Sequence, residues 1–207
     1  MSTLLHVDSS PMGPASVSRH LSATFTDHWK KAHAGGTVLT RDLANTKLES
    51  VTAEFVAASY TPAEARTAEQ KATLEASDKL IAELQAADEY AIGVAMHNFG
   101  VPSVLKQWID LISRAGVTFA FVDGAPKGLL TGKKATFLIA TGGAYGPGSA
   151  AASLNFVEPY LRGFFGFLGV TDVRFETAGG TMALNYGANR AEFLQPYDEA
   201  VAALAGQ

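Results

Sequence analysis

Four serines gather between residues 9 and 18, around two prolines and a glycine, just ahead of a helical pattern. They are Ser9, Ser10, Ser16 and Ser18. A helix N-terminus presents free backbone N–H groups and the positive end of the helix dipole, and both attract anions. Serine hydroxyls add hydrogen-bond donors without adding positive charge. The segment is therefore typical of a site for a terminal phosphate, although Ser16 acting only as a helix N-cap would produce part of the same pattern.

Two further segments have the composition of ligand-binding loops. The residues Met96-His97-Asn98-Phe99 place two polar side chains between two apolar ones, so a flat heteroaromatic ring can pack there while Asn98 binds its rim. The stretch 140–146 contains Gly142 and Gly143, which allow a ligand to approach the main chain closely. Each segment also has a simpler explanation, as a turn in which Asn98 satisfies local backbone groups or as a flexible loop.

Several other chemistries are excluded or disfavoured. The chain has no cysteine, which rules out disulfides, thiol catalysis and cysteine-ligated metals. The five histidines show no ligand-like spacing with carboxylates, so we expect no metal site. There is no Gly-x-Ser-x-Gly elbow and no Gly-x-Gly-x-x-Gly after the first apolar run, and residues 128–134 lack the spacing of a P-loop. With no obvious acid–base pair, the sequence favours a reaction whose chemistry comes from a bound cofactor.

The order of elements predicts how these loops are held. Strands are expected at residues 4–8, 37–43, 89–95, 135–140 and 172–177. Helices are expected at about 17–31, 54–59, 67–86, 102–114, 153–168 and 190–204, with Pro102 at the first helical position; 117–122 should be extended and 123–128 a turn. This alternation predicts one α/β domain over residues 1–207, with a parallel sheet covered by helices on both faces. Ligands bind beyond the carboxyl ends of such strands, where all three loops fall.

The composition limits which binding partners and which cellular compartment are expected. The 207 residues carry a net charge of −4, and their Lys and Arg residues are scattered, so we expect no nucleic-acid partner and no membrane surface. No apolar stretch approaches the roughly 18 residues of a membrane span. The N-terminus lacks the basic flank and cleavage site of a signal peptide. A cytoplasmic protein is the expectation.

The segment 153–168 carries two apolar stripes that only Glu158 and Arg162 interrupt with charge. A helix that is apolar over so much of its surface should be buried on two sides. One side is expected to face the sheet and the other a second subunit. The alternative is an unusually enclosed helix in a monomer.

At these loops the sequence resembles the FMN-dependent NADH-azoreductase family, relatives of the quinone reductases within the flavodoxin-like superfamily. The resemblance covers nearly the whole chain. It is carried by Ser9-Ser10, Ser16-x-Ser18, Met96-x-Asn98-Phe99, the residues 114–119 (Arg-Ala-Gly-Val-Thr-Phe), 131–134 (Thr-Gly-Lys-Lys), Gly142-Gly143 and 166–169 (Gly-Phe-Leu-Gly). It implies a flavodoxin-like fold with a five-stranded parallel sheet of order 2-1-3-4-5. It also implies a homodimer that binds FMN non-covalently and passes two electrons, in a ping-pong sequence, from NADH or NADPH to a quinone or azo compound.

The resemblance also implies a set of cofactor-binding residues. They are Ser10, Ser16, Val17, Ser18, Met96, His97, Asn98, Phe99, Ala140, Thr141, Gly142 and Gly143. The first four would hold the phosphate and the others would contact the isoalloxazine. No catalytic side chain is expected, although His97, where the family commonly has Tyr, is a candidate for substrate contact or proton delivery. Ala140-Thr141 replaces a Ser-Arg pair that the family often has.

On the acceptor side, Phe121, Phe164 and Phe165 are candidates for substrate contact, but core packing would explain these rings equally well. Two other functions stay open at this point. One is a one-electron carrier of the flavodoxin type, and the other is a non-catalytic module that binds a phosphate-bearing ligand.

Overall fold

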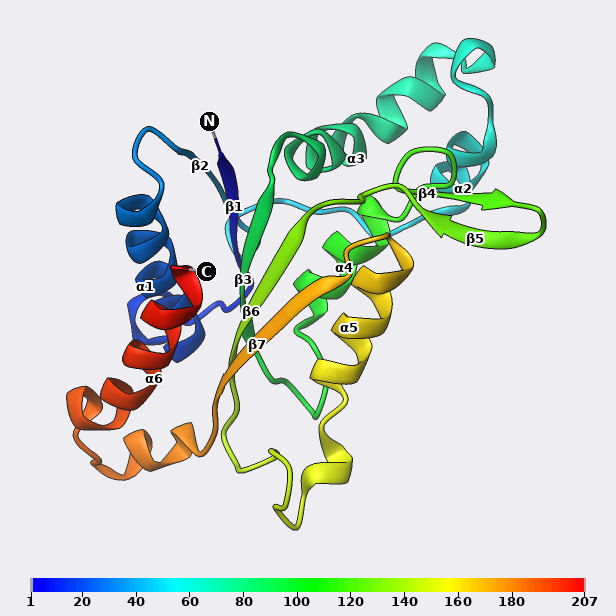
Figure 1. Ribbon diagram of the computed structural model, residues 1–207. Helices are drawn as coiled ribbons and strands as arrows, with labels where there is room; N and C mark the ends of the chain where they lie inside the picture. The colour runs from blue at the N-terminus through cyan, green and yellow to red at the C-terminus, as the bar shows by residue number, and fades with distance from the viewer. Residues whose placement is uncertain (1, 207) are drawn as a thin grey trace.

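Five parallel strands form the central sheet, in the order β2-β1-β3-β6-β7 (Figure 1). The computed structural model describes residues 2–206. The strands are β1 (Thr3–Asp8), β2 (Thr37–Asp42), β3 (Glu89–Ala95), β6 (Lys134–Ala140) and β7 (Asp172–Ala178). Counted among these five strands alone, the order is the 2-1-3-4-5 order that the sequence predicted.

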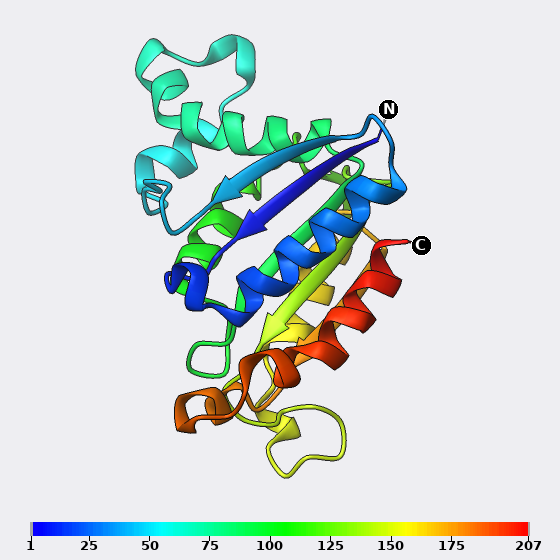
Figure 2. The same cartoon turned by 90° about the vertical axis from the view of Figure 1, so that its left-hand side faces the viewer.

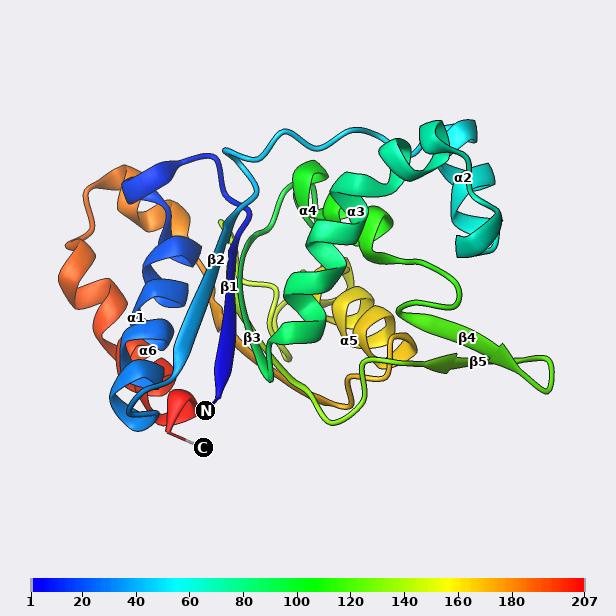
Figure 3. The same cartoon turned by 90° about the horizontal axis from the view of Figure 1, so that it is seen from above.

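Helices cover both faces of the sheet, as Figures 2 and 3 show from two sides. One face carries α1 (Val17–Ala32) and α6 (Arg190–Ala205). The other carries α3 (Ala68–Ala86), α4 (Ser103–Ile112) and α5 (Val157–Phe167), with α2 (Ala53–Tyr60) packed against α3.

The alternation of side chains along each strand divides the core between these two faces. In β1, Leu4 belongs to the cluster under α1 and α6, whereas Leu5 and Val7 belong to the cluster under α3, α4 and α5. Successive side chains of a strand point to opposite faces. Leu21 and Phe25 repeat at four-residue spacing in α1 and fill the first cluster, which confirms the helical stripe expected there.

Two helix starts differ from the sequence prediction. Pro102 is the N-cap of α4, one position outside the helix, and α4 ends at Ile112. The helix expected at 153–168 begins only at Val157, after a 3-10 turn, η3 (Ala152–Leu154). Between them the side chain of Asn155 accepts hydrogen bonds from the N–H groups of Val157 and Glu158, at 3.2 and 3.4 Å. A side chain bonded to the backbone in this way starts a new helix and interrupts a continuous one.

A second, two-stranded sheet projects beyond the main one (Figure 1). It is an antiparallel hairpin of β4 (Phe119–Val122) and β5 (Ala125–Gly128). The turn is therefore only Asp123-Gly124, both with positive φ (51° and 79°), which is the backbone that two-residue hairpins require. The prediction of a turn over all of 123–128 was wrong, because residues 125–128 pair as a strand.

Three other short 3-10 helices complete the chain: η1 (Gly13–Ala15), η2 (Ala63–Ala65) and η4 (Thr181–Tyr186). Among residues 2–206 there is no helix with the length and apolar character needed to span a bilayer.

Candidate functional site

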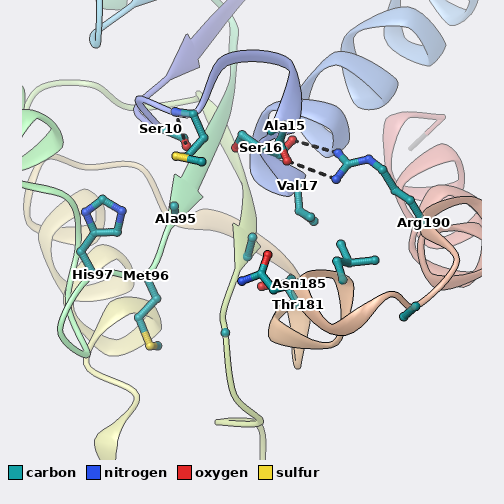
Figure 4. Close-up of a pocket in the computed structure, with 15 residues that line it drawn as sticks. Ser10, Ala15, Ser16, Val17, Ala95, Met96, His97, Thr181, Asn185 and Arg190 are labelled. Atoms are coloured by element: carbon teal, nitrogen blue, oxygen red, sulfur yellow. Dashed lines mark hydrogen bonds between the residues drawn. The ribbon is translucent and has the colours of Figure 1, made fainter.

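A pocket of about 390 Å³ opens at the carboxyl edge of the sheet (Figure 4). It brings together residues from all three predicted loops: Ser10, Ser16, Val17, Met96, His97, Ala140 and Gly142. The rest of the wall comes from Met12, Ala15, Ala95, Thr181, Leu184, Asn185, Ala188 and Arg190. The sheet topology explains this convergence, since β1, β3 and β6 are adjacent parallel strands whose carboxyl ends meet.

The serine loop, which we define as residues 9–16, has its three serine side chains buried and hydrogen-bonded. The Oγ of Ser9 donates to the carbonyl of Gly93 at 2.7 Å, so this serine joins the loop to β3 and does not line the pocket. Ser16 is the N-cap of α1 and accepts from the N–H of Arg19 at 3.3 Å. Its Oγ also lies 3.2 Å from that of Ser18, which is fully buried behind it. Ser16 therefore both caps the helix and lines the pocket with Ser10.

An ion-pair network fixes the serine loop from beneath. The guanidinium of Arg19 donates from Nε to the carbonyl oxygen of Ser10 at 2.7 Å. Its other nitrogens contact Asp8 at 3.3 Å and Asp42 at 2.5 and 3.0 Å, and Ser22 donates to Asp8 at 2.7 Å. The hydrogen bond from Arg19 holds the pKa of Asp42 below its ordinary value. The Arg19 side chain thus joins the first turn of α1 to the ends of β1 and β2.

The second loop, which we call the Met96 turn (residues 96–100), is held by its backbone. His97 and Gly100 exchange two backbone hydrogen bonds of 3.0 Å, and the N–H of Met96 donates to the carbonyl of Ala140 at 2.9 Å. Asn98 and Phe99 have φ values of 50° and 70°, in the left-handed region that non-glycine residues seldom adopt. Strain of this kind concentrates at functional sites. The side chains of His97, Asn98 and Phe99 are exposed, and only the first lines the pocket.

The third loop presents its backbone N–H groups. The carbonyls of Thr141, Gly142 and Gly143 accept hydrogen bonds from Thr181, Met182 and Gly180, at 3.0 to 3.2 Å. Within the described chain, the N–H groups of Gly142 and Gly143 donate to no protein acceptor. Gly142 lies in the pocket lining, so its N–H group is a candidate donor to a ligand carbonyl there. Thr141 and Gly143 themselves lie outside the pocket lining.

Sequence reasoning missed one wall of the pocket. The segment after β7 contributes Thr181, Asn185 and Arg190, and none of the three was a candidate. In Figure 4, Arg190 reaches the start of α1, where its guanidinium donates to the carbonyls of Ala15 and Ser16 at 3.1 and 3.3 Å. The sequence did contain one signal for this wall: Gly179-Gly180 follow β7 at the same edge of the sheet as the other loops.

The three candidate substrate residues do not line this pocket within one chain. Phe121 is exposed on the hairpin, and Phe164 is half-buried on α5. Phe165 has no exposed surface, since its ring packs among Tyr90, Trp108 and Phe137. Core packing accounts for the position of Phe165.

No group of three or more His, Cys, Asp or Glu side chains in residues 2–206 is placed to hold a metal ion. The pocket is lined by hydroxyls, apolar side chains, the imidazole of His97, the carboxamide of Asn185 and one guanidinium. Such a set suits an organic ligand with an anionic end.

Known proteins are similar to this chain in sequence or in structure over almost its whole length. A family described as having a flavodoxin-like fold matches residues 2–202. An FMN-dependent NADH:quinone oxidoreductase of Acidobacterium capsulatum is 53% identical over 197 residues, covering 95% of both chains. FMN-dependent NADH:quinone oxidoreductase 3 of Burkholderia lata is 46% identical over 205 residues, covering 99% of both.

Solved structures agree with these sequence matches. An azoreductase from Bacillus anthracis superposes with a TM-score of 0.89 at 28% identity, covering 100% of this chain and 99% of its own. An FMN-dependent NADH-azoreductase from the same species, solved in complex with FMN, superposes with a TM-score of 0.87 at 25% identity, covering 99% and 98%. Sequence identity over nearly the full length, a matching family and a shared fold lead to one conclusion: the chain belongs to the FMN-dependent NADH:quinone oxidoreductase and azoreductase family, with a flavodoxin-like fold.

Proposed function

We propose that this protein is an FMN-dependent NAD(P)H oxidoreductase that reduces quinones and azo compounds by two-electron ping-pong transfer. One observation carries the proposal: the three loops predicted to hold a flavin converge on one pocket at the carboxyl edge of the sheet. Relatives with 46% and 53% identity over almost the whole chain bear the name FMN-dependent NADH:quinone oxidoreductase.

The residues of the pocket fit FMN. Its phosphate requires donors near a helix N-terminus, and the start of α1 offers the hydroxyls of Ser10 and Ser16. Its ring has carbonyl and nitrogen acceptors along one edge, and the unused N–H groups of Gly142 and Gly143 match them. Met96 supplies an apolar surface between these ends. The cavity volume lies within the roughly 300–1,000 Å³ typical of small-ligand pockets.

When bound, FMN would supply the hydride and electron chemistry, because no described side chain in the pocket forms an acid–base pair. The protein's own groups would bind and orient. Ser10, Ser16, Val17 and Ser18 would fix the phosphate end, directly or by supporting the α1 N-terminus. The segments Met96–Phe99 and Ala140–Gly143 would set the plane of the ring. Amides that are already in place stabilise negative charge on a ring edge without reorganising.

We also propose that the active form is a homodimer. Phe156, the N-cap of α5, is 57% exposed and Phe167, its last residue, is 36% exposed, with Tyr160 and Phe164 half-buried between them. Val157, Leu161 and Phe165 face the core, and Tyr160 and Phe164 pack against it only in part. The exposed rings support a second subunit over the alternative of an enclosed helix in a monomer. Contiguous exposed aromatics of this kind are typical of an interface.

Such a dimer would let Phe121 and Phe164 reach the acceptor side of the pocket in the partner subunit. Phe165 would act there only through the packing of Phe164, whose ring lies 5.7 Å from its own. The stretch of chain described here has no membrane-spanning helix, and we propose that the enzyme works in the cytoplasm.

The test is anaerobic stopped-flow spectroscopy of FMN-reconstituted protein, mixed first with NADH and then with a quinone. We expect rapid loss of the flavin absorbance with NADH and rapid recovery with quinone. Bound flavin that NADH fails to reduce would indicate a carrier of the flavodoxin type. Failure to bind FMN would leave only a binding module and would refute the proposal.

A further inference from the structure

Arg190 is the one permanently charged side chain among the described residues that line the pocket. It is the first residue of α6, and the Asn189 side chain caps that helix by accepting from two backbone N–H groups. An arginine keeps its charge at any pH at which the protein is folded. The pocket therefore has a fixed positive charge on a wall that the sequence motifs do not include.

The guanidinium lies beside the phosphate end of the pocket. Nη1 and Nη2 donate to the carbonyls of Ala15 and Ser16, at 3.1 and 3.3 Å. These are the last two residues before α1, and Ser16 is its N-cap. Figure 4 shows the side chain of Arg190 reaching from α6 to this point, on the opposite side of the pocket from His97. A guanidinium has five N–H donors, so donors remain after these two bonds.

The charge of Arg190 is not neutralised by the protein. Its hydrogen-bond partners are both carbonyls, and no carboxylate in residues 2–206 forms an ion pair with it. The other arginine near the serine loop, Arg19, is already paired with Asp8 and Asp42. A cation that has neutral partners and lies in a concave site keeps its attraction for an incoming anion, whereas a doubly paired one does not.

We propose that Arg190 is a ligand of the flavin phosphate and selects FMN over the same flavin without phosphate, riboflavin. The inference rests on the proposed function, because it takes FMN as the occupant. The proposal adds a charged contact from α6 to the phosphate site. The two hydrogen bonds to the carbonyls of Ala15 and Ser16 would hold the guanidinium beside the N-terminus of α1. Charge-assisted hydrogen bonds to phosphate are about twice as strong as neutral ones.

The experiment measures binding of FMN and of riboflavin to apoprotein by quenching of flavin fluorescence. The variants are Arg190→Met, which removes charge and donors, and Arg190→Lys, which keeps the charge. The matched control is Arg66→Met. Arg66 also donates to two backbone carbonyls, those of Ala58 and Thr61, but lies outside this pocket.

We expect Arg190→Met to weaken FMN about 10- to 100-fold, the size of a lost charged hydrogen bond, and to change riboflavin affinity less than about 2-fold. Arg190→Lys should recover part of the FMN affinity, and Arg66→Met should leave both affinities unchanged. The salt dependence of FMN binding should also decrease in Arg190→Met.

Equal weakening of FMN and riboflavin would show that Arg190 acts only by holding α6 against α1, and would overturn the proposal. Unchanged FMN affinity would overturn it as well. If the wild-type protein binds neither flavin, the proposed function fails separately. Arg190 is then tested with inorganic phosphate, which must raise the melting temperature of the wild type and not of Arg190→Met.

Discussion

The serine loop and the Met96 turn follow neighbouring strands and open on the same pocket, but they are held in different ways. The serine loop is fixed by side chains: Ser9 to β3, Ser16 to α1, and Arg19 to the carbonyl of Ser10. The Met96 turn is fixed by its backbone, with two bonds between His97 and Gly100 and with exposed side chains.

The difference shows where each loop tolerates change. A loop fixed by buried polar side chains loses its shape when one of them is removed, because each removal leaves an unsatisfied partner. A turn fixed by its backbone depends instead on which residues accept its dihedral angles. The serine loop should therefore be sensitive to side-chain chemistry, and the Met96 turn to backbone preference.

The largest effect should come from Arg19→Met. It leaves Asp8 and Asp42 without their cation and the Ser10 carbonyl without its donor. Removing one member of a largely buried ion pair costs about 3 kcal/mol, and we expect a loss of about 2–3 kcal/mol in the free energy of unfolding, since Asp42 is partly exposed. Urea titration of the apoprotein measures this. Arg66→Met is the control. An equal loss of unfolding free energy in that variant would show that the Arg19 network stabilises the fold no more than an ordinary arginine does.

Gly93→Ala should cost less, about 1–3 kcal/mol. A Cβ at Gly93 would lie 2.8 Å from Asp8 Oδ1 and 3.0 Å from Ser22 Oγ, so it would push apart the groups beneath the serine loop. Gly146→Ala is the matched control, because a Cβ there meets nothing within 4 Å. Thermal unfolding of both variants checks the prediction, which fails if the two melting temperatures agree.

Acid should weaken the network by a smaller amount. The pKa of Asp42 is lowered in the folded state, first by the hydrogen bond from Arg19. A carboxylate with a depressed folded pKa adds stability above its unfolded pKa, near 3.8, and loses it as the pH falls through the folded value. Below about pH 4, wild-type protein should therefore lose unfolding free energy faster than Asp42→Asn. Parallel slopes between pH 5 and pH 2.5 in urea titrations would contradict this.

The smallest effects should be in the Met96 turn. Asn98 has a φ of 50° and its side chain is exposed. Asn98→Gly should change the unfolding free energy by less than about 0.5 kcal/mol, since glycine accepts this backbone but is more flexible when unfolded. Asn98→Val should cost about 1–2 kcal/mol, because a β-branched residue is strained there. If the valine variant is as stable as the glycine variant, the turn is not held by its dihedral preference.

The sequence was a good guide to the parts of the molecule that depend on local pattern. The alternation of strands and helices, helix stripes such as Leu21 and Phe25, and the convergence of three loops follow from periodicity and from the rule for parallel sheets. The strand order was implied by the family resemblance. The second strand of the hairpin, Ala125–Gly128, was not predicted, because it contains a proline and a glycine, which are rare in strands.

The parts that sequence could not supply depend on contacts between distant residues. Arg190 donates hydrogen bonds to Ala15 and Ser16, which lie about 175 positions away in the sequence. No local sequence pattern predicts that contact. The same applies to the pairing of Arg19 with Asp42. Phe165 is a different case: the stripe on α5 was visible, but which side of it faces the core is decided only by packing.

The base of the β4–β5 hairpin is a contact of backbone on backbone. A Cβ at Gly128 would lie 2.1 Å from the main chain of Leu168 and Gly169, so position 128 admits no side chain. The tip at Asp123-Gly124 is exposed and, in Figure 1, stands far from the sheet. An inserted epitope should therefore be tolerated at the tip of this arm, whereas any side chain at Gly128 should displace its base.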